Sequence, residues 1–345
     1  MQTTRHPTPA SSGPAVSPAV LDLDCAAEAE RIATAMRTIA AQRLLRRGFV
    51  LGVSGGIDSS ACAMLAAKAV GPKRVHALLM PERDSSPEST EKGKIVCAAA
   101  GIPYEVVDIA PTLESLGCYQ RRTQAIQRIL PSYRHGDRFK IAVAGNVTGS
   151  DQMSFFSLIA ELSAEGNRRV TVRMPADVYL AIVAATNLKQ RIRKLLEYTR
   201  ADELNYAVIG TPNRLEYDQG FFVRGGDGLA DVKPIAHLYK TQVFAMARHF
   251  GLPPVITEQT PSTDTYSLPQ TQDEFYFKLP YAQMDLLLWA EVHGVPAADA
   301  GRSLGLTEVE VERVYRDIEA KRRVANQLDG SAILVDPAAS RKGRS

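Results

Sequence analysis

A glycine-rich loop, SGGIDS at residues 54–59, separates a short apolar run from a stretch of small residues. Between a buried strand and a helix, such a loop directs backbone N–H groups and the positive end of the helix toward an anion. Gly55 and Gly56 permit a close approach that side chains would block, and the hydroxyls of Ser54 and Ser59 can donate hydrogen bonds. The loop therefore predicts a binding site for a pyrophosphate group.

Asp58 lies at the helical end of this loop, where its charge would repel a phosphate unless a divalent cation lay between them. Mg²⁺ takes oxygen ligands and commonly joins a protein carboxylate to substrate phosphates. Asp58 is therefore a candidate Mg²⁺ ligand. A plain glycine turn with Asp58 as the helix N-cap is the alternative, although the full string is more specific than a lone glycine pattern.

Around the loop, short apolar runs alternate with longer segments of helical spacing, which predicts an α/β fold with an open parallel sheet flanked by helices. Strands are expected at 49–53, 75–80, 104–109 and 205–210, and helices at 21–47, 60–69, 86–100, 178–200, 240–250, 281–293 and 308–327. Residues 116–177 interrupt this alternation. We treat them as an insertion that could hold strands at 139–143 and 169–174, and we assign them no chemistry.

The chain has 345 residues and a formal net charge of +3, from 41 Lys and Arg against 38 Asp and Glu. This balance gives no indication of a nucleic-acid or membrane partner. The four cysteines are widely spaced, so we expect reduced thiols and a cytoplasmic protein. Residues 1–20 are rich in Pro, Ser and Thr and are expected to form a disordered tail before a domain at 21–330, with a second loose end at 331–345.

The string at 54–59 resembles the pyrophosphate loop of the N-type ATP pyrophosphatases, which adenylate an oxygen and release pyrophosphate. Later segments are similar to signatures of the NAD synthetases, ammonia-dependent type: NLKQRIR at 187–193, GTPNRLE at 210–216 and GFFVRGGDGLAD at 220–231. The recognisable pieces span residues 51–284. The resemblance implies an adenine nucleotide alpha-hydrolase-like fold with the segment 116–177 inserted into it.

The resemblance also implies the reaction: the nicotinate carboxylate of deamido-NAD attacks the α-phosphorus of ATP, and ammonia then displaces AMP. It implies ATP contacts from Ser54, Gly55, Gly56, Asp58, Ser59, Thr211, Lys240 and Ser262, with Asp58 and Lys240 catalytic. Glu216, expected at a strand end, would join Asp58 as a Mg²⁺ ligand. Arg191, Asp227 and Lys321 would bind deamido-NAD, and Asp231 would contact the incoming ammonium as a third catalytic residue.

Two departures from the family pattern leave the acceptor open. The segment 116–177 is longer than the usual connection, and Ala320 stands where ammonia-dependent relatives often show a histidine. An adenylating amide ligase that acts on another carboxylate is therefore the alternative. A tRNA-modifying relative would need catalytic cysteines or a strongly basic surface, and a non-catalytic nucleotide-binding regulator is disfavoured by the set of Asp58, Glu216 and Lys240.

The nitrogen donor is inferred from what precedes the first strand. Residues 1–47 are too few to form the nitrilase-type amidase domain that glutamine-using relatives carry. We therefore expect free ammonia, or ammonia delivered by a separate glutaminase chain. The resemblance further implies a homodimer. The six histidines are scattered without a ligand spacing, so no zinc is expected.

Overall fold

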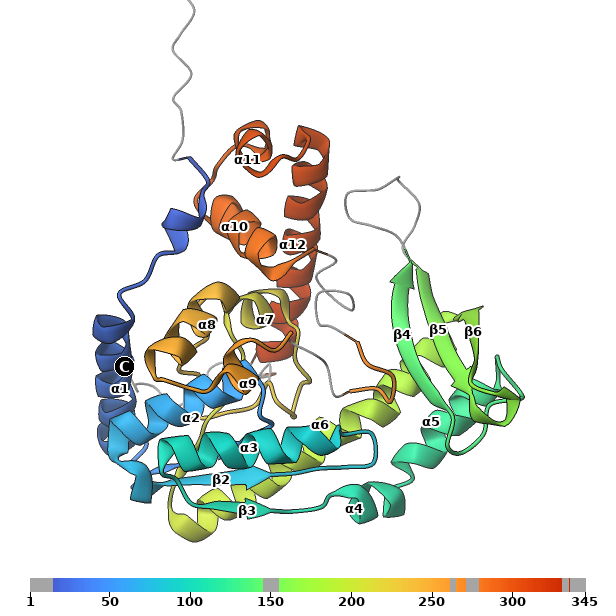
Figure 1. Cartoon of the computed structure of the whole chain (residues 1–345), viewed down its shortest axis with the longest axis horizontal. Helices are drawn as coiled ribbons and strands as arrows, with labels where there is room; N and C mark the ends of the chain where they lie inside the picture. Colours follow the sequence, from blue (N-terminus) through green and yellow to red (C-terminus); the bar gives the residue numbers. More distant parts are fainter. Residues whose placement is uncertain (1–14, 145–154, 261–264, 271–278, 331–334, 336–345) are drawn as a thin grey trace, which may run out of the picture.

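The computed structural model describes residues 15–144, 155–260, 265–270, 279–330 and 335. Its central sheet is parallel throughout and has the strand order β3-β2-β1-β7 (Figure 1). The strands are β1 (Phe49–Gly52), β2 (Val75–Leu79), β3 (Tyr104–Val106) and β7 (Ala207–Val208). The predicted open parallel sheet is confirmed. β3 and β7 are shorter than expected, and only a single bridge from Ile209 to Val232 extends the β7 edge.

Helices cover both faces of this sheet because successive strand residues point to opposite sides. Phe49 and Leu51 of β1 join one core with the helices on one face, whereas Val50 joins a second core with residues of α6. The first face carries α1 (Cys25–Thr38), α2 (Ile57–Val70), α3 (Pro87–Ala100) and α8 (Lys240–His249), and the second carries α6 (Ala176–Leu204).

The predicted helix at 21–47 is divided in the structure. A 3-10 turn at Pro18–Leu21 comes first, and α1 then begins at Cys25, where the side chain of Asp24 caps it by accepting from the Ala27 amide. A π-helical turn at Ile39–Arg43 ends the helix. A further 3-10 turn, Pro72–Arg74, leads from α2 into β2.

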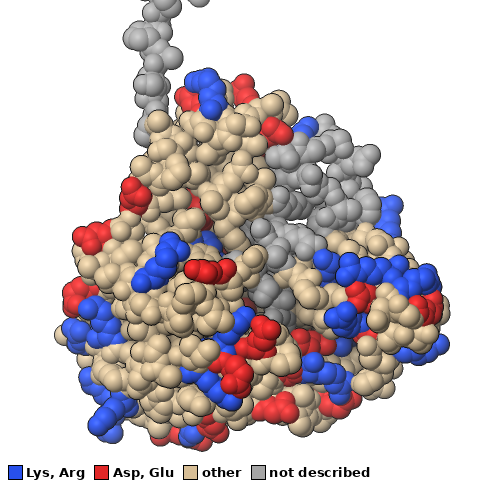
Figure 2. Space-filling view, viewed as in Figure 1, with Lys and Arg blue, Asp and Glu red and all other residues tan. Residues whose placement is uncertain are grey.

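The segment 116–177 forms a small antiparallel sheet of its own, in the order β4-β5-β6. It follows α4 (Ala110–Ser115) and contains α5 (Cys118–Gln127), β4 (Arg138–Ala144), β5 (Phe155–Leu162), a 3-10 turn (Ser163–Glu165) and β6 (Arg168–Arg173). The strands expected at 139–143 and 169–174 are confirmed; β5, which pairs with both, was not predicted. Figure 2 shows Lys and Arg side chains gathered over this part of the molecule.

The last three helices, α10 (Tyr281–Val292), α11 (Ala297–Leu304) and α12 (Glu308–Asp329), lie together, away from β2 and β3 (Figure 1). Leu215 of α7 (Arg214–Gln219) joins their core, whereas Ile256 of α9 (Pro254–Thr257) joins the core on the first face of the parallel sheet. Val16 and Leu21 pack into the core formed by α10, α11 and α12, so the first described residues lie against the last helices. In the ranges that the structure describes, no helix is both long and apolar enough to cross a membrane.

Candidate functional site

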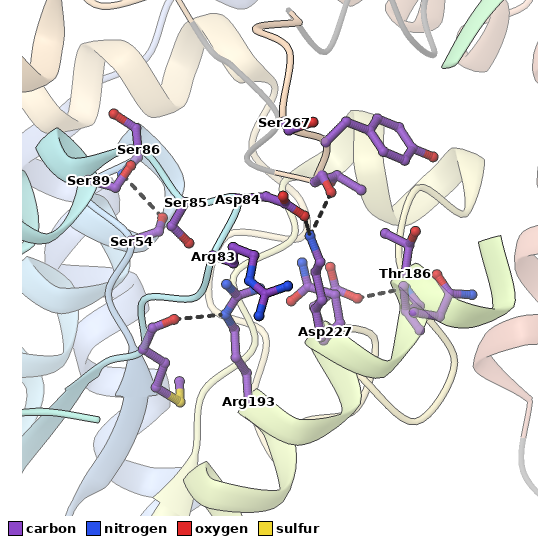
Figure 3. A pocket seen from close by; sticks show the side chains of 18 of the residues that line it. Ser54, Arg83, Asp84, Ser85, Ser86, Ser89, Thr186, Arg193, Asp227 and Ser267 are labelled. Atoms are coloured by element: carbon purple, nitrogen blue, oxygen red, sulfur yellow. Dashed lines mark hydrogen bonds and ion pairs between the residues drawn. The ribbon is translucent and has the colours of Figure 1, made fainter. Parts of the chain in front are cut away.

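A cavity of about 1730 Å³ opens at the carboxyl ends of β1, β2 and β7. Ligands of open α/β sheets commonly bind at this edge because the loops that leave the strands meet there. The glycine loop, the residues that follow β2, one face of α6 and the segment 116–177 all contribute to its wall. Figure 3 shows side chains of the glycine loop, of the residues that follow β2 and of α6 converging on it.

The glycine loop has the conformation that its sequence predicts. Gly55 has φ +78°, and a Cβ atom there would lie 2.5 Å from Cβ of Lys92, so only glycine fits. Gly56 is the N-cap of α2. The hydroxyls of Ser54 and Ser59 lie 3.3 Å apart, and the Gly56 amide donates to Ser54 at 3.3 Å. Two hydroxyls and a helix N-terminus thus meet at the cavity, an arrangement suited to an anion.

Asp58, Glu216 and Lys240 come together beside this loop, as the family resemblance implied. The buried ammonium of Lys240 pairs with one carboxylate oxygen of Asp58, and the side-chain amide of Asn213 donates to the other at 3.0 Å. Burial, together with the charge of Asp58, raises the pKa of Glu216 to about 8. The same two carboxylates keep the pKa of Lys240 above its ordinary value despite its burial.

The expected position of Glu216 at the end of a strand is wrong. Glu216 lies in α7, where it forms a capping box with Asn213: the Asn213 side chain accepts from the Glu216 amide, and Glu216 accepts from the Asn213 amide at 3.1 Å. The pair Asn-x-x-Glu at 213–216 is a helix-start signature. It could have indicated that Glu216 lies in a helix and not at the end of a strand.

Asp285 of α10 is a site residue that sequence reasoning missed. Its carboxylate accepts hydrogen bonds from the amides of Lys240 and Thr241 at 3.2 and 2.7 Å, and so it fixes the first turn of α8. Burial raises its pKa to about 6. The Tyr281 ring also lies 5.3 Å from the Lys240 ammonium. Asp285 sits in an otherwise apolar run, which gave no sign that it would cap another helix.

The residues expected to bind the acceptor line the same cavity. Arg191 donates to the Arg224 carbonyl at 3.3 Å, Asp227 accepts from the Val223 amide at 2.6 Å, and Lys321 pairs with Asp317 at 2.7 Å. Burial raises the pKa of Asp227.

Three further predicted residues differ in their placement. Thr211 lines the cavity, whereas Ser262 lies outside the described residues. Asp231 is exposed and does not line the cavity: its carboxylate accepts from the Val208 amide at 2.8 Å and from the Tyr198 hydroxyl at 3.3 Å. The structure therefore places it in support of β7 and away from the cavity in which ammonium would be used.

The segment 116–177, to which we assigned no chemistry, contributes side chains to the cavity wall. Arg122 of α5 pairs with Asp84, which also accepts from Lys189 of α6 at 2.5 Å. Lys189 reaches Glu82 at 2.9 Å, and Glu82 accepts from the Tyr119 hydroxyl at 2.9 Å. All of these side chains are buried, so this network joins the segment to the parallel-sheet core at the cavity wall.

The parallel sheet and its glycine loop define an adenine nucleotide alpha-hydrolase-like protein. The NAD synthase family profile matches residues 29–156 and 169–325, and the chain belongs to this family. The resemblance inferred from its motifs is thus confirmed.

Curated relatives agree with this assignment, and solved structures share the fold. The chain is 52% identical to the NH(3)-dependent NAD(+) synthetase of Rhizobium meliloti over 92% of its own length and 94% of the relative. It is 48% identical to that of Rhizobium rhizogenes over 96% and 99%. In fold it is similar to an NMN synthetase from Francisella tularensis (TM-score 0.62, 20% identity, 91% and 99% covered) and to the NH3-dependent NAD synthetase of Campylobacter jejuni (TM-score 0.59, 19% identity, 91% and 100% covered).

Proposed function

We propose that this chain is an ATP-dependent, ammonia-using NAD synthetase. It would amidate deamido-NAD through an adenylated nicotinate carboxylate and release AMP and pyrophosphate. The observation that carries the proposal is the cluster of Asp58, Glu216 and Lys240 beside the glycine loop, in a cavity large enough for two nucleotides. The relatives that are about half identical over nearly the whole chain are named for this activity.

The site's own residues account for the first half-reaction. The glycine loop and the amides at the start of α2 hold the phosphates of ATP, and Lys240 balances the negative charge that builds as pyrophosphate leaves. Asn213 fixes the carboxylate of Asp58 in place. Arg191 and Lys321 neutralise the acceptor, so that its carboxylate can approach the α-phosphorus. Ammonia then attacks the activated carbonyl.

Asp58 and Glu216 fit a Mg²⁺ ion. Among the described residues no three His, Cys, Asp or Glu side chains gather into a metal-binding group. Mg²⁺ does not need three protein ligands, because one or two carboxylates, phosphate oxygens and water molecules usually complete its coordination shell. When bound, the ion would neutralise the phosphates of ATP and of the leaving pyrophosphate.

Mg²⁺-ATP binding is expected to release protons below pH 8. Without the metal, the raised pKa of Glu216, about 8, keeps its carboxyl largely protonated at neutral pH. A cation favours the ionised form, so binding at pH 7 should release up to about one proton, and the release should vanish above pH 9. Calorimetry in two buffers of different ionisation enthalpy measures this number. Glu216→Gln should abolish the release, and an unchanged release in that variant would contradict the assignment.

The reaction itself is tested by incubating the protein with Mg²⁺-ATP, deamido-NAD and ammonium while NAD, AMP and pyrophosphate are followed together. Equal amounts of all three are expected. Pyrophosphate without NAD, or turnover only with a different carboxylate, would favour the alternative amide ligase. Replacing ammonium by glutamine should give no NAD, since the relatives at 52% and 48% identity are named as NH(3)-dependent.

We further propose that residues 21–330 act as one catalytic unit, that the protein is cytoplasmic, and that it works as a homodimer. The absence of an apolar membrane-crossing helix among the described residues is compatible with the proposed location. Light scattering of the purified chain tests the dimer: a mass near twice that of one chain supports it, and the mass of a single chain contradicts it.

A further inference from the structure

The peptide that joins Gly55 to Gly56 lies at the centre of the glycine loop, so its orientation affects how the loop meets an anion. In a trans peptide the C=O and the N–H point in opposite directions. The Gly56 amide faces the hydroxyl of Ser54 at 3.3 Å, and this hydroxyl lies 3.3 Å from that of Ser59 in the first turn of α2. The carbonyl of Gly55 therefore points away from the two hydroxyls.

The reverse orientation of this peptide is sterically open because both of its residues are glycine. Gly56 has φ −77°, and reversing the peptide would give it a positive φ, which glycine adopts at no steric cost. The Gly55 carbonyl would then point toward the hydroxyls of Ser54 and Ser59. Backbone N–H groups attract a phosphate, whereas a carbonyl oxygen in their place would repel it. The two glycines permit the tight loop, but they do not select the orientation that binds an anion.

Gln259 supplies a contact that favours the observed orientation. Its side-chain amide donates to the Gly55 carbonyl at 2.8 Å, and the side chain is half-buried in the cavity wall. Gln259 lies two residues beyond the end of α9, and Ile256 of α9 is fully buried in the core that also contains Ala61 of α2. The donor is therefore carried by the same core that carries the glycine loop.

We propose that Gln259 is a positioning residue for the phosphates of ATP. By holding the Gly55 carbonyl, it keeps the Gly56 amide on the side of the loop where the phosphates bind. The identity of the ligand rests on the proposed function. The role requires a hydrogen-bond donor at position 259, and a side chain that only fills the same space does not supply it.

The test measures binding of pyrophosphate and ATP, each with Mg²⁺, by calorimetry without turnover. Gln259→Met has a similar length but no donor, and Gln259→Glu keeps the shape but can only accept when it is ionised. Gln259→Met is expected to raise the Kd for both ligands about three- to tenfold, the usual effect of losing one hydrogen bond. Gln259→Glu should raise it further. In turnover, the KM for ATP should rise while the KM for deamido-NAD stays unchanged.

Gln127→Met is the matched control. Gln127 also lines the cavity, and its side-chain amide also donates to a backbone carbonyl, that of Tyr133 at 2.8 Å, but it belongs to α5. This variant should bind pyrophosphate as the wild type does. The positioning role is overturned if either variant of Gln259 binds pyrophosphate as tightly as the wild type, or if Gln127→Met loses affinity by the same factor.

The two proposals can fail separately because binding is measured without the reaction. A chain that binds pyrophosphate through this contact but forms no NAD would contradict the proposed function and leave the role of Gln259 in place. A chain that forms NAD while both variants of Gln259 keep the wild-type Kd for pyrophosphate would overturn only the role of Gln259.

Discussion

Asp58→Asn is expected to lower kcat for NAD formation by about 10²–10³-fold, the usual loss when one preorganised electrostatic group is removed from an active site. Asparagine keeps the size of the side chain, and one oxygen can still accept from Asn213. It removes the charge that pairs with Lys240 and would hold Mg²⁺. Initial rates of AMP and NAD formation across a Mg²⁺ titration measure the effect, and the Mg²⁺ requirement should rise together with the loss of kcat.

Lys240→Met tests whether Asp58 and Lys240 act as one unit. Because Lys240 and the Mg²⁺ that Asp58 would hold both act on the same phosphates, the double variant should lose much less than the product of the two single losses. Glu91→Gln, in the exposed part of α3, serves as the matched carboxylate control and should retain wild-type rates. Full activity of Asp58→Asn at every Mg²⁺ concentration would contradict the role of Asp58 as a metal ligand.

Asp84→Ala is expected to lower the free energy of unfolding by about 3–5 kcal/mol, because it leaves two buried cations without their shared partner. The side chain of Asp84 is 5% exposed and that of Lys189 is 2% exposed. Arg122, from the segment 116–177, loses its ion-pair partner in the same change. Urea denaturation measures the loss, and limited proteolysis should show the segment 116–177 cleaved earlier than in the wild type.

The stability that Asp84 supplies also depends on pH. Burial alone would raise its pKa, but Lys189 and Arg122 hold the pKa below the ordinary value for an aspartate. The contribution is therefore complete above about pH 4 and is lost as the pH falls through the lower folded-state value. Glu165→Ala removes an exposed ion pair to Arg168 in the same segment, and it should change the free energy of unfolding by less than about 1 kcal/mol. An equal loss in both variants would contradict the argument.

The parallel sheet could be predicted from the sequence because its strands are short apolar runs that end in glycine or proline, with helical periodicity between them. The expected helix at 86–100 agrees with α3, since Ser86 caps its start and Gly101 ends it in the left-handed conformation. The strand β5 was missed because its partners lie on either side of it in the sequence, and pairing depends on contacts that a single run of residues does not reveal.

Site residues that belong to recognisable motifs could be predicted from the sequence. Contacts between separate helices and strands could not. Asp58 and Lys240 are distant in sequence, and only the family resemblance indicated that they meet. Nothing in the pattern joined Asp84 to Arg122 or Asp285 to the start of α8, because each pair links separate elements through a few buried atoms. The position of Asp231 could not be predicted either, because its carboxylate accepts from the amide of Val208, which lies 23 residues away in the sequence.

The edges of the antiparallel sheet differ in a way that bears on how the protein behaves at high concentration. The edge of β4 is covered, since Leu268 donates to the Phe139 carbonyl at 3.0 Å and Ser267 accepts from the Phe139 amide. β6 pairs with β5 alone within the described part of the chain, and Arg168, Arg169 and Arg173 are exposed along it. Two such strands from neighbouring molecules would bring like charges together. The arginines thus discourage edge-to-edge aggregation at a strand that would otherwise invite it.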